Sequence, residues 1–392
     1  MAKLILKRGR DARVKGGHPW IYRSEVAEVA GDWRTGEAVS VLDGEGRFVG
    51  RGFYNPRPSL VCRLLTRQDE PVDGAFFRRR IAAALAIRRE AGLVSDAFRV
   101  VWSEADGLPG LIVDRYASVA VIRCLTLGMT RCRPWIVEAL RGPEGLADYH
   151  YGHDEVTAGR LEGFEPLRGW IDAAGPPEIE IREGPCRFVV SIEGGQKTGF
   201  YLDQRENRAL VAGLAHGRRF LDVFCYSAAF ACQGLAAGAA RAVGIESSPE
   251  AVAFARRNLA LNGLEDRAEL REGNAFDLLR GMERTGERFD LVVLDPPPFT
   301  RTKAALEAAA RGYKEINLRA LRLLSPGGIV ATFSCSHHVS PAQFEEICRA
   351  AAADARVTVR VLASLTQCRD HPILLNVPET RYLKGLLLEA IS

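Results

Sequence analysis

The stretch Leu291-Val-Val-Leu-Asp-Pro-Pro-Pro-Phe299 decides how the second half of this chain is expected to fold. Leu291 to Leu294 is an unbroken apolar run of strand length, which is typical of a strand buried on both faces of a parallel sheet. Asp295 ends the run, and the three prolines after it cannot donate hydrogen bonds to a sheet, so the chain must leave the sheet there. An acid at the carboxyl end of such a strand lies where open α/β sheets bind their ligands.

Apolar runs of strand length alternate with helical patterns on both sides of this stretch. They cover residues 219–224, 242–246, 268–271, 290–294 and 328–333. Two more runs, 357–362 and 382–391, are expected to form an antiparallel pair at the end of the chain. Strands that alternate with helices are typical of a doubly wound α/β fold, which we expect for residues 191–392.

Polar residues follow three consecutive strands of this expected sheet. Glu246 comes 24 residues after Asp222, the spacing of an acid that accepts hydrogen bonds from ribose hydroxyls, and Asn274 is placed to contact an adenine edge. The loop between Phe224 and Phe230 contains no glycine, whereas a dinucleotide loop needs G-x-G-x-x-G to approach a pyrophosphate. The pattern therefore favours S-adenosylmethionine, which has no phosphate, over a nicotinamide cofactor.

Residues 1–72 are expected to form a small β-rich domain. Residues 1–70 hold 13 Lys and Arg against 9 Asp and Glu, and the other 322 residues hold 40 of each, so the whole net charge of +4 lies in this first segment. Lys7, Arg8, Arg10 and Trp20 combine positive charge with an aromatic ring, as in proteins that bind single-stranded nucleic acid. The alternative is an ordinary solvated surface with Trp20 in the core of a small barrel.

Residues 73–190 are expected to form an α+β middle domain. A helix from residue 73 to 92 carries an apolar stripe, and strands with a second helix near 133–140 follow. We find no catalytic constellation in this segment. Nine cysteines without a C-x-x-C pair indicate a reduced, cytoplasmic protein, and neither a membrane-spanning run nor a secretory leader is evident.

Four motifs resemble those of the RlmI/RlmO-type family of 23S rRNA cytosine-5 methyltransferases, and the similarity covers essentially the whole chain. They are Lys197-Thr-Gly-Phe-Tyr-Leu-Asp-Gln-Arg205, Asp222-Val-Phe-Cys-Tyr-Ser227, Asp295-Pro-Pro-Pro-Phe299 and Ser334-Cys-Ser336. The resemblance implies a Rossmann-like class I methyltransferase domain, preceded by a PUA domain that binds RNA and by the middle domain. It also implies S-adenosylmethionine as cofactor and 23S rRNA as partner, while a homodimer stays open.

The resemblance also implies a set of residues around the cofactor. The family loop usually has glycine where this chain has Ala228 and Ala229, so the backbone there must avoid left-handed angles or tolerate strain. The acid after the second strand is Glu instead of the commoner Asp, and the adenine contact is Asn instead of Asp. The expected cofactor-binding residues are Lys197, Tyr201, Gln204, Asp222, Phe224, Tyr226, Ser227, Glu246, Asn274, Ala275 and Asp295.

The expected mechanism starts from the low nucleophilicity of cytosine C5. A Cys335 thiolate that adds to C6 makes an adduct whose C5 can attack a methyl group. Asp295 would hold N3, the carbonyls of Pro296 and Pro297 would accept from the exocyclic amine, and Phe299 would stack on an unpaired or flipped base. The alternative for Cys335 is a buried small side chain without a catalytic role.

Two other functions stay open at this point. The Asp-Pro-Pro-Phe turn also serves methylation of an amino group, for which Cys335 would be dispensable. The glycine-free loop leaves room for a non-catalytic RNA-binding assembly factor. Cys335, His337 and His338 do not form a metal site, because adjacent histidines cannot easily share one tetrahedral ion.

Overall fold

The computed structural model describes residues 2–92, 95–142, 146–195, 198–300 and 303–391. By their packing, these residues divide into two compact units. Unit 1 comprises Met1–Ile181, Val190–Leu202 and Arg369–Thr380, and unit 2 comprises Arg182–Val189, Asp203–Cys368 and Arg381–Ser392. The division into domains at residues 72 and 190 stays a prediction.

Unit 1 begins with a six-stranded sheet in the order β2-β6-β5-β4-β1-β3. Alternating small and branched apolar side chains, among them Leu4, Ile21 and Val41, are fully buried on its inner face. A short helix, α1 (Ala12–Lys15), precedes β2. The strands are β1 (Lys3–Leu6), β2 (Trp20–Tyr22), β3 (Val26–Ala30), β4 (Ala38–Leu42), β5 (Phe48–Tyr54) and β6 (Leu60–Thr66).

A five-stranded sheet in the order β11-β10-β9-β8-β7 forms the rest of unit 1. Helix α2 (Gly74–Glu90) starts where the Asp73 carboxylate accepts a hydrogen bond from the Phe76 amide, and it buries Phe76 and Phe77 in the same core. The other helices are α3 (Leu127–Arg131), α4 (Arg133–Arg141) and α5 (Val156–Glu162). The strands are β7 (Ala97–Trp102), β8 (Leu111–Tyr116), β9 (Val119–Cys124), β10 (Tyr149–His153) and β11 (Arg168–Trp170).

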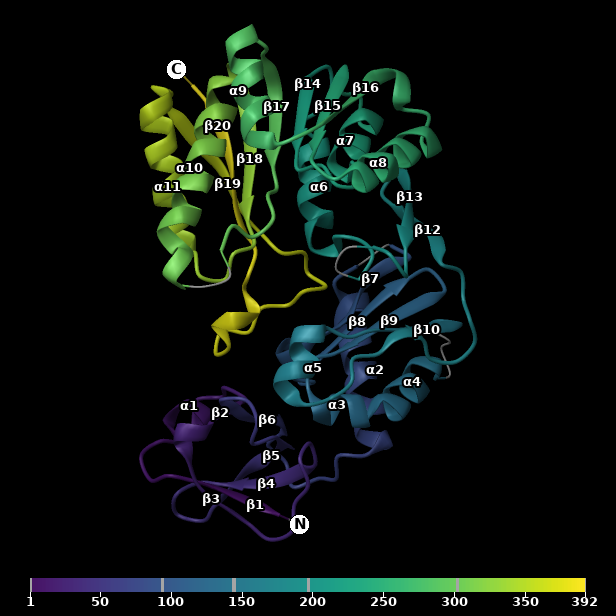
Figure 1. Cartoon of the computed structure of the whole chain (residues 1–392), viewed down its shortest axis with the longest axis vertical. Helices are drawn as coiled ribbons and strands as arrows, with labels where there is room; N and C mark the ends of the chain where they lie inside the picture. The colour runs from purple at the N-terminus through teal and green to yellow at the C-terminus, as the bar shows by residue number, and fades with distance from the viewer. Residues whose placement is uncertain (1, 93–94, 143–145, 196–197, 301–302, 392) are drawn as a thin grey trace. The chain divides into compact units, whose positions relative to one another are not determined.

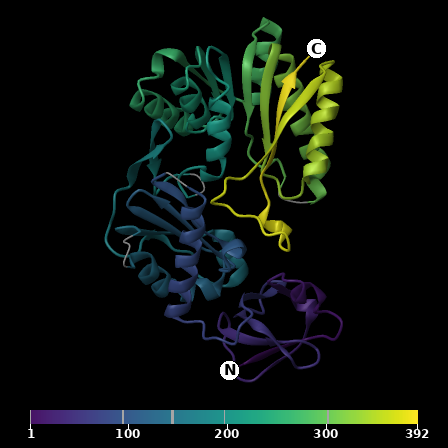
Figure 2. The ribbon, with the colours of Figure 1, turned by 180° about the vertical axis from the view of Figure 1, so that it is seen from behind.

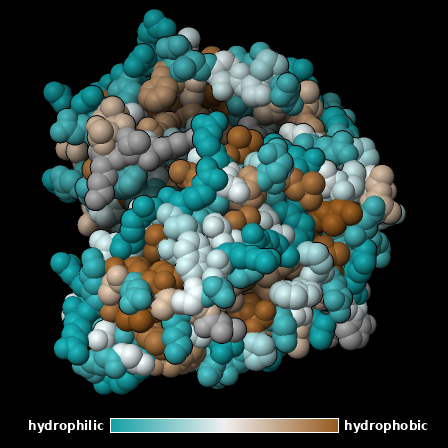
Figure 3. Space-filling model, turned by 60° about the horizontal axis from the view of Figure 1, so that its bottom comes forward, coloured by the Kyte–Doolittle hydropathy of each residue, from teal (hydrophilic) through white to brown (hydrophobic). Residues whose placement is uncertain are grey.

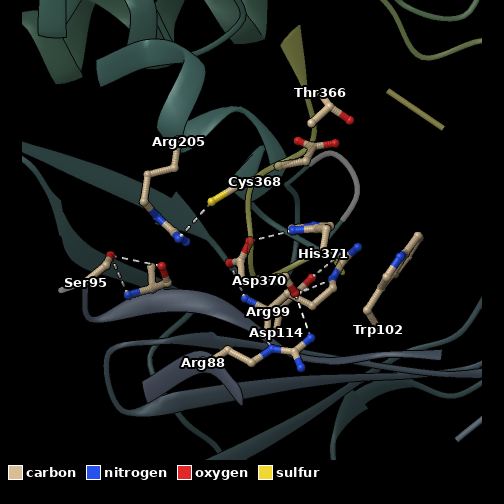
Figure 4. A network of polar contacts seen from close by, with 12 residues as sticks. Arg88, Ser95, Arg99, Trp102, Asp114, Arg205, Thr366, Cys368, Asp370 and His371 are labelled. Atoms are coloured by element: carbon tan, nitrogen blue, oxygen red, sulfur yellow. Dashed lines mark hydrogen bonds and ion pairs between the residues drawn. The ribbon is translucent and has the colours of Figure 1, made fainter. Parts of the chain in front are cut away.

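A buried network of ion pairs and hydrogen bonds links α2 and β7 to the late segment Arg369–Thr380 (Figure 4). Arg99 Nε and Nη2 each donate to a carboxylate oxygen of Asp114 over 2.7 Å. Arg88 binds Asp106 through both guanidinium ends, and its Nη2 also donates to the Asp370 carbonyl over 2.7 Å. The Asp370 carboxylate in turn accepts from the Arg99 amide at 2.9 Å. These contacts explain why a segment from the end of the chain packs with unit 1.

The core of unit 2 is a seven-stranded sheet in the order β16-β15-β14-β17-β18-β20-β19 (Figure 1). Its first five strands in the chain, β14 to β18, are parallel to one another, and β20 is antiparallel to both β18 and β19. This order confirms the predicted doubly wound sheet with an antiparallel last pair. The strands are β14 (Arg219–Val223), β15 (Arg241–Glu246), β16 (Ala268–Glu272), β17 (Phe289–Leu294), β18 (Leu324–Ser334), β19 (Val359–Thr366) and β20 (Lys384–Ala390).

Helices cover this sheet, and α10 packs on α11 beside β18 and β20 (Figure 1). Phe289, Val292, Tyr313 and Phe344 lie in one continuous buried core of strands and helices. Figure 2 shows the yellow strand β20 next to β18 and β19 from behind. The helices are α6 (Arg205–Ala212), α7 (Ala229–Ala236), α8 (Pro249–Leu261), α9 (Ala275–Thr285), α10 (Leu306–Arg322) and α11 (Pro341–Ala355), and β12 (Glu178–Glu183) pairs with β13 (Cys186–Ser191).

The surface is mixed in character. On the face shown in Figure 3, hydrophilic residues separate the hydrophobic ones into small groups. Within the described ranges, the search for a helix long and apolar enough to cross a membrane finds none.

Candidate active site

The loop between β14 and α7 has a left-handed backbone at three residues that are not glycine. The φ angles are +66° at Phe224, +48° at Tyr226 and +58° at Ala228. Two amides of the loop are held by the neighbouring strand, since Cys225 N donates to the Ile245 carbonyl over 3.0 Å and Tyr226 N to Glu246 Oε2 over 3.0 Å. The sequence left open whether this glycine-free loop avoids left-handed angles or tolerates them. In the structure the loop adopts left-handed angles and is therefore strained.

Glu246 lies at the carboxyl end of β15 and organises the backbone around it. Its Oε1 accepts from the amides of Ser247 and Ser248 at 2.8 and 3.0 Å, and its Oε2 accepts from Tyr226 N. The side chain is only partly buried, and Oε2 can accept a second hydrogen bond beside the one from Tyr226 N. Glu246 can therefore accept a hydrogen bond from a ribose hydroxyl, and this contact stays a prediction.

Asp222 lies on β14 and is 1% exposed. Its Oδ2 accepts a hydrogen bond from Ala231 N at the start of α7, over 3.0 Å. Burial raises the pKa of Asp222 to about 7, the Ala231 hydrogen bond opposes this rise, and the charges of Asp295 and Glu246 add to it. Three acids at neighbouring strand ends thus repel one another.

The third strand end places Asn274 in an exposed position. Its side chain caps α9 by accepting from Phe276 N over 2.9 Å, and Ala275 is buried as the first residue of that helix. The amide nitrogen of Asn274 remains available to a base edge. Ser227 is buried in the β14–α7 loop, and its carbonyl accepts from Asn258 Nδ2 over 3.0 Å.

Asp295 and Cys335 follow adjacent parallel strands, β17 and β18, so the structure brings the two together. The Cys335 thiol lies 3.9 Å from the carbonyl oxygen of Pro296. Cys335 is partly exposed, whereas the other eight cysteines are buried. Asp295 is also partly exposed, Pro296 is buried and Pro297 is exposed. The thiol thus lies at the turn that follows β17, and the catalytic roles of Cys335 and Asp295 stay predictions.

Phe299 packs in an aromatic cluster behind this turn. Its ring centroid lies 4.6 Å from that of Tyr313, 5.9 Å from Phe276 and 6.4 Å from Phe224. The Tyr313 hydroxyl is 2.9 Å from Ser336 Oγ, so the cluster also supports the strand end that carries Cys335. Stacking of Phe299 on a base stays a prediction.

Gln204 carries a buried amide without a partner. The residue is 1% exposed, its Oε1 accepts from Asn207 Nδ2 over 2.6 Å, and its Nε2 has no hydrogen-bond partner among the described residues. Such a group suits a ligand acceptor. Tyr201 belongs to unit 1, and Lys197 lies outside the described residues.

The predicted RNA-contacting residues lie in unit 1. Lys7, Arg8 and Arg10 are exposed, and Arg8 Nε donates to the Gly44 carbonyl over 3.1 Å. Trp20 is half-buried, and its indole nitrogen donates to Glu104 Oε1 over 2.8 Å. The three basic side chains form an exposed positive edge, while Trp20 is in part a structural contact.

Lys384 is a residue of the site that the sequence analysis missed. It starts β20 opposite Ser334, and it is 8% exposed. Its Nζ donates to the Ser336 carbonyl over 2.6 Å and to the Tyr382 carbonyl over 3.1 Å. A single lysine before the apolar run Leu386-Leu-Leu388 was the available signal.

The residues present fit S-adenosylmethionine better than a nucleotide. Asp222, Glu246 and Asp295 make the strand ends acidic, which favours a sulfonium cation and repels a phosphate. Gln204 adds an amide donor, and Glu246 has room for a ribose hydroxyl. No group of three His, Cys, Asp or Glu suited to a metal ion is found in the part of the chain that the structure describes. The fold and these strand ends define a class I methyltransferase.

Comparisons with known proteins agree with this class. The PUA-like domain model matches residues 4–67, and the model of the S-adenosylmethionine-dependent methyltransferases matches residues 155–372. Ribosomal RNA large subunit methyltransferase I of Alteromonas mediterranea is 39% identical, with 99% of this chain and 98% of that protein covered. The protein of the same name from Shewanella denitrificans is 39% identical, with 98% of each covered.

A solved structure agrees on the fold. SMU.776, which is described as a methyltransferase complexed with SAH, superimposes with a TM-score of 0.86 over 99% of this chain and 100% of that one, at 18% identity. The chain therefore belongs to the family of S-adenosylmethionine-dependent methyltransferases that includes the ribosomal RNA large subunit methyltransferase I proteins. The predicted fold class and cofactor are confirmed.

Proposed function

We propose that this chain methylates C5 of a cytosine in large-subunit ribosomal RNA. The observation that carries the proposal is the pair of strand ends at which the Cys335 thiol lies 3.9 Å from the Pro296 carbonyl, next to Asp295. The names of the full-length relatives support ribosomal RNA of the large subunit as the substrate. The PUA-like segment supports RNA binding.

The chemistry needs a nucleophile at C6. Cys335 Sγ, as thiolate, forms a bond to C6, and the electron pair of the C5–C6 double bond moves toward C5 and the N3 side of the ring. S-adenosylmethionine supplies a methyl carbon on sulfonium, so C5 bonds to that carbon and the sulfonium bond breaks. Loss of the C5 proton to a base and of Cys335 from C6 restores the aromatic ring and returns the thiolate.

Asp295 is proposed to hold N3 of the cytosine. Addition at C6 increases the negative charge at N3, so a proton shared between N3 and the Asp295 carboxyl stabilises the adduct. The exposed Pro297 offers its carbonyl to the exocyclic amine, together with that of Pro296. This turn would therefore recognise cytosine while Cys335 attacks it.

The base must leave a helix to meet these groups, so we propose an unpaired or flipped cytosine as the target. Lys7, Arg8 and Arg10 of unit 1 would bind RNA phosphates. Acting on ribosomal RNA, the enzyme would work in the cytoplasm. A homodimer stays a prediction that sedimentation of the full chain can test.

The decisive experiment uses ribosomal RNA that contains 5-fluorocytosine. Fluorine at C5 cannot leave as a proton, so the adduct should persist as a covalent protein–RNA complex on a denaturing gel. We expect the complex with the wild-type chain and with Cys348→Ala, a matched control whose buried thiol lies on α11. We expect none with Cys335→Ala, and full methyl transfer by Cys335→Ala would instead support methylation of an amino group.

A further inference from the structure

Lys384 is placed by the sheet itself beside the proposed nucleophile. β18 ends at Ser334, and in the antiparallel register of β18 and β20 the residue opposite Ser334 is Lys384. Cys335 is the next residue after that pair. The side chain of Lys384 is 8% exposed, so a positive charge is held in a poorly solvated place.

The Lys384 ammonium spans the strand end that carries the thiol. Nζ donates to the Ser336 carbonyl over 2.6 Å, directly after Cys335, and to the Tyr382 carbonyl over 3.1 Å. Backbone pairing at Ser334 and this side-chain bond at Ser336 therefore hold Cys335 on both sides. An ammonium has three N–H donors, and one remains beyond these two contacts with described residues.

The charge of Lys384 interacts with the thiolate of Cys335. Burial lowers the pKa of Lys384 to about 8, and the negative charge of Cys335 opposes that decrease. The attraction is mutual, so the ammonium favours the thiolate form of Cys335 in turn. Burial has the opposite effect on other cysteines, since it raises the pKa of Cys62 and Cys348 to about 12.

Other ionisable groups also face the thiol. Tyr313 on α10 feels the charge of Cys335, but burial raises the pKa of its hydroxyl, so it stays a neutral phenol bonded to Ser336. Asp295 follows β17 and brings a negative charge that disfavours the thiolate. His337 and His338 follow in the chain and add positive charge only when protonated. Lys384, which carries a positive charge below its pKa of about 8, is the cation placed to offset Asp295.

We propose that Lys384 is a positioning residue that keeps Cys335 ionised at neutral pH and fixes the Ser334–Ser336 strand end beneath the cytosine. The inference rests on the proposed role of Cys335 as nucleophile and adds the group that activates it. Lys384 makes and breaks no bond to the substrate. Its role is to increase the fraction of Cys335 that is ionised and to hold the thiolate in position for attack on C6.

The test is the pH dependence of Cys335 alkylation by iodoacetamide in the full chain, followed by mass spectrometry of the Cys335 peptide. Only the thiolate reacts, so the rate reports its ionisation. In Lys384→Met the midpoint should rise by at least about one pH unit, which is about tenfold less thiolate at neutral pH. Lys384→Arg keeps the charge and should stay close to the wild type.

Two further variants keep the test sharp. Lys314→Met removes an exposed lysine of α10 that pairs with Asp354, and it should leave the midpoint unchanged. Lys384→Gln keeps a donor for the Ser336 carbonyl without the charge, so it should still raise the midpoint if Lys384→Met does not fold. If neither neutral variant folds, a wild-type midpoint at or above about 8.5, the ordinary cysteine value, overturns the inference.

The outcomes separate this inference from the proposed function. An unchanged midpoint in a folded Lys384→Met or Lys384→Gln overturns the role of Lys384 and leaves the thiolate mechanism standing. Full methyl transfer by Cys335→Ala overturns the mechanism, whatever the midpoints are. A raised midpoint with loss of methyl transfer that recovers at higher pH supports both.

Discussion

Two buried carboxylates of unit 1 and the strand-end acids of unit 2 are stabilised in opposite ways. In unit 1, Asp114 and Asp106 each bind a buried arginine through both oxygens. In unit 2, the strand-end acid Asp222 accepts a hydrogen bond from a backbone amide instead, and burial, helped by the neighbouring acids, raises its pKa to about 7. A paired carboxylate completes a fold, while an unpaired one among other acids is ready for a cationic ligand.

The largest effect should come from breaking a pair in unit 1. Asp114→Ala leaves Arg99, which is 7% exposed, without its carboxylate, and should cost about 3 to 5 kcal/mol of unfolding free energy. Urea denaturation measures the loss, and hydrogen exchange should place it at β7 and β8. The exposed pair of Glu346 with Arg349 is the control, since Glu346→Ala should leave the unfolding midpoint unchanged.

A double variant sharpens this prediction. Asp114→Leu together with Arg99→Met removes both charges and should recover most of the stability that Asp114→Ala loses. If the double variant is as unstable as Asp114→Ala, the instability comes from the lost shape of the ion pair in the core and not from the unpaired charge of Arg99.

The next effect concerns Asp222, whose uncompensated charge should cost stability. Its folded pKa of about 7 lies above the ordinary value of 3.8, so the folded protein binds more protons than the unfolded chain between these values. Stability from this group therefore decreases as pH rises toward 7, by up to about 1.4 kcal/mol for each pH unit. Asp222→Asn keeps an acceptor for the Ala231 amide and removes this dependence.

The measurement compares the unfolding free energies of Asp222→Asn and the wild type at about pH 5 and about pH 8. The unfolding free energy of the variant should increase relative to that of the wild type as pH rises. Calorimetry should show that S-adenosylmethionine binds the variant more weakly. If the difference in unfolding free energy is the same at both pH values, the charge of Asp222 is neutralised by its surroundings, as the charge of Asp114 is by Arg99.

The sequence predicts the acids of unit 2 and not the pairs of unit 1, for a physical reason. Asp222, Glu246 and Asp295 each follow an apolar run, so their place at one sheet edge comes from a local pattern. The partner of Arg88 at Asp370 depends on packing between distant parts of the chain. The same holds for Lys384, whose burial depends on the β18–β20 register.

The backbone of the β14–α7 loop was beyond prediction for another reason. Local preference disfavours a left-handed φ at Phe224, Tyr226 and Ala228, so this backbone depends on hydrogen bonds such as those from Tyr226 to Glu246 and from Cys225 to Ile245. The sequence shows that the loop lacks glycine, but whether its backbone adopts left-handed angles depends on its contacts with β15.

The smallest effect should come from relieving this strain, and the chain offers a matched control for it. Ala228 is 0% exposed with a φ of +58°, while Ala231 is 1% exposed inside α7. Replacement by glycine removes one buried methyl at either position, but it relieves a left-handed alanine only at Ala228 and weakens a helix only at Ala231. Ala228→Gly should therefore be more stable than Ala231→Gly by about 1 to 2 kcal/mol in urea denaturation. Equal stabilities of the two variants would mean that the loop beside Asp222 stores no strain. The repulsion among the strand-end acids would then be the destabilising feature of the site that remains.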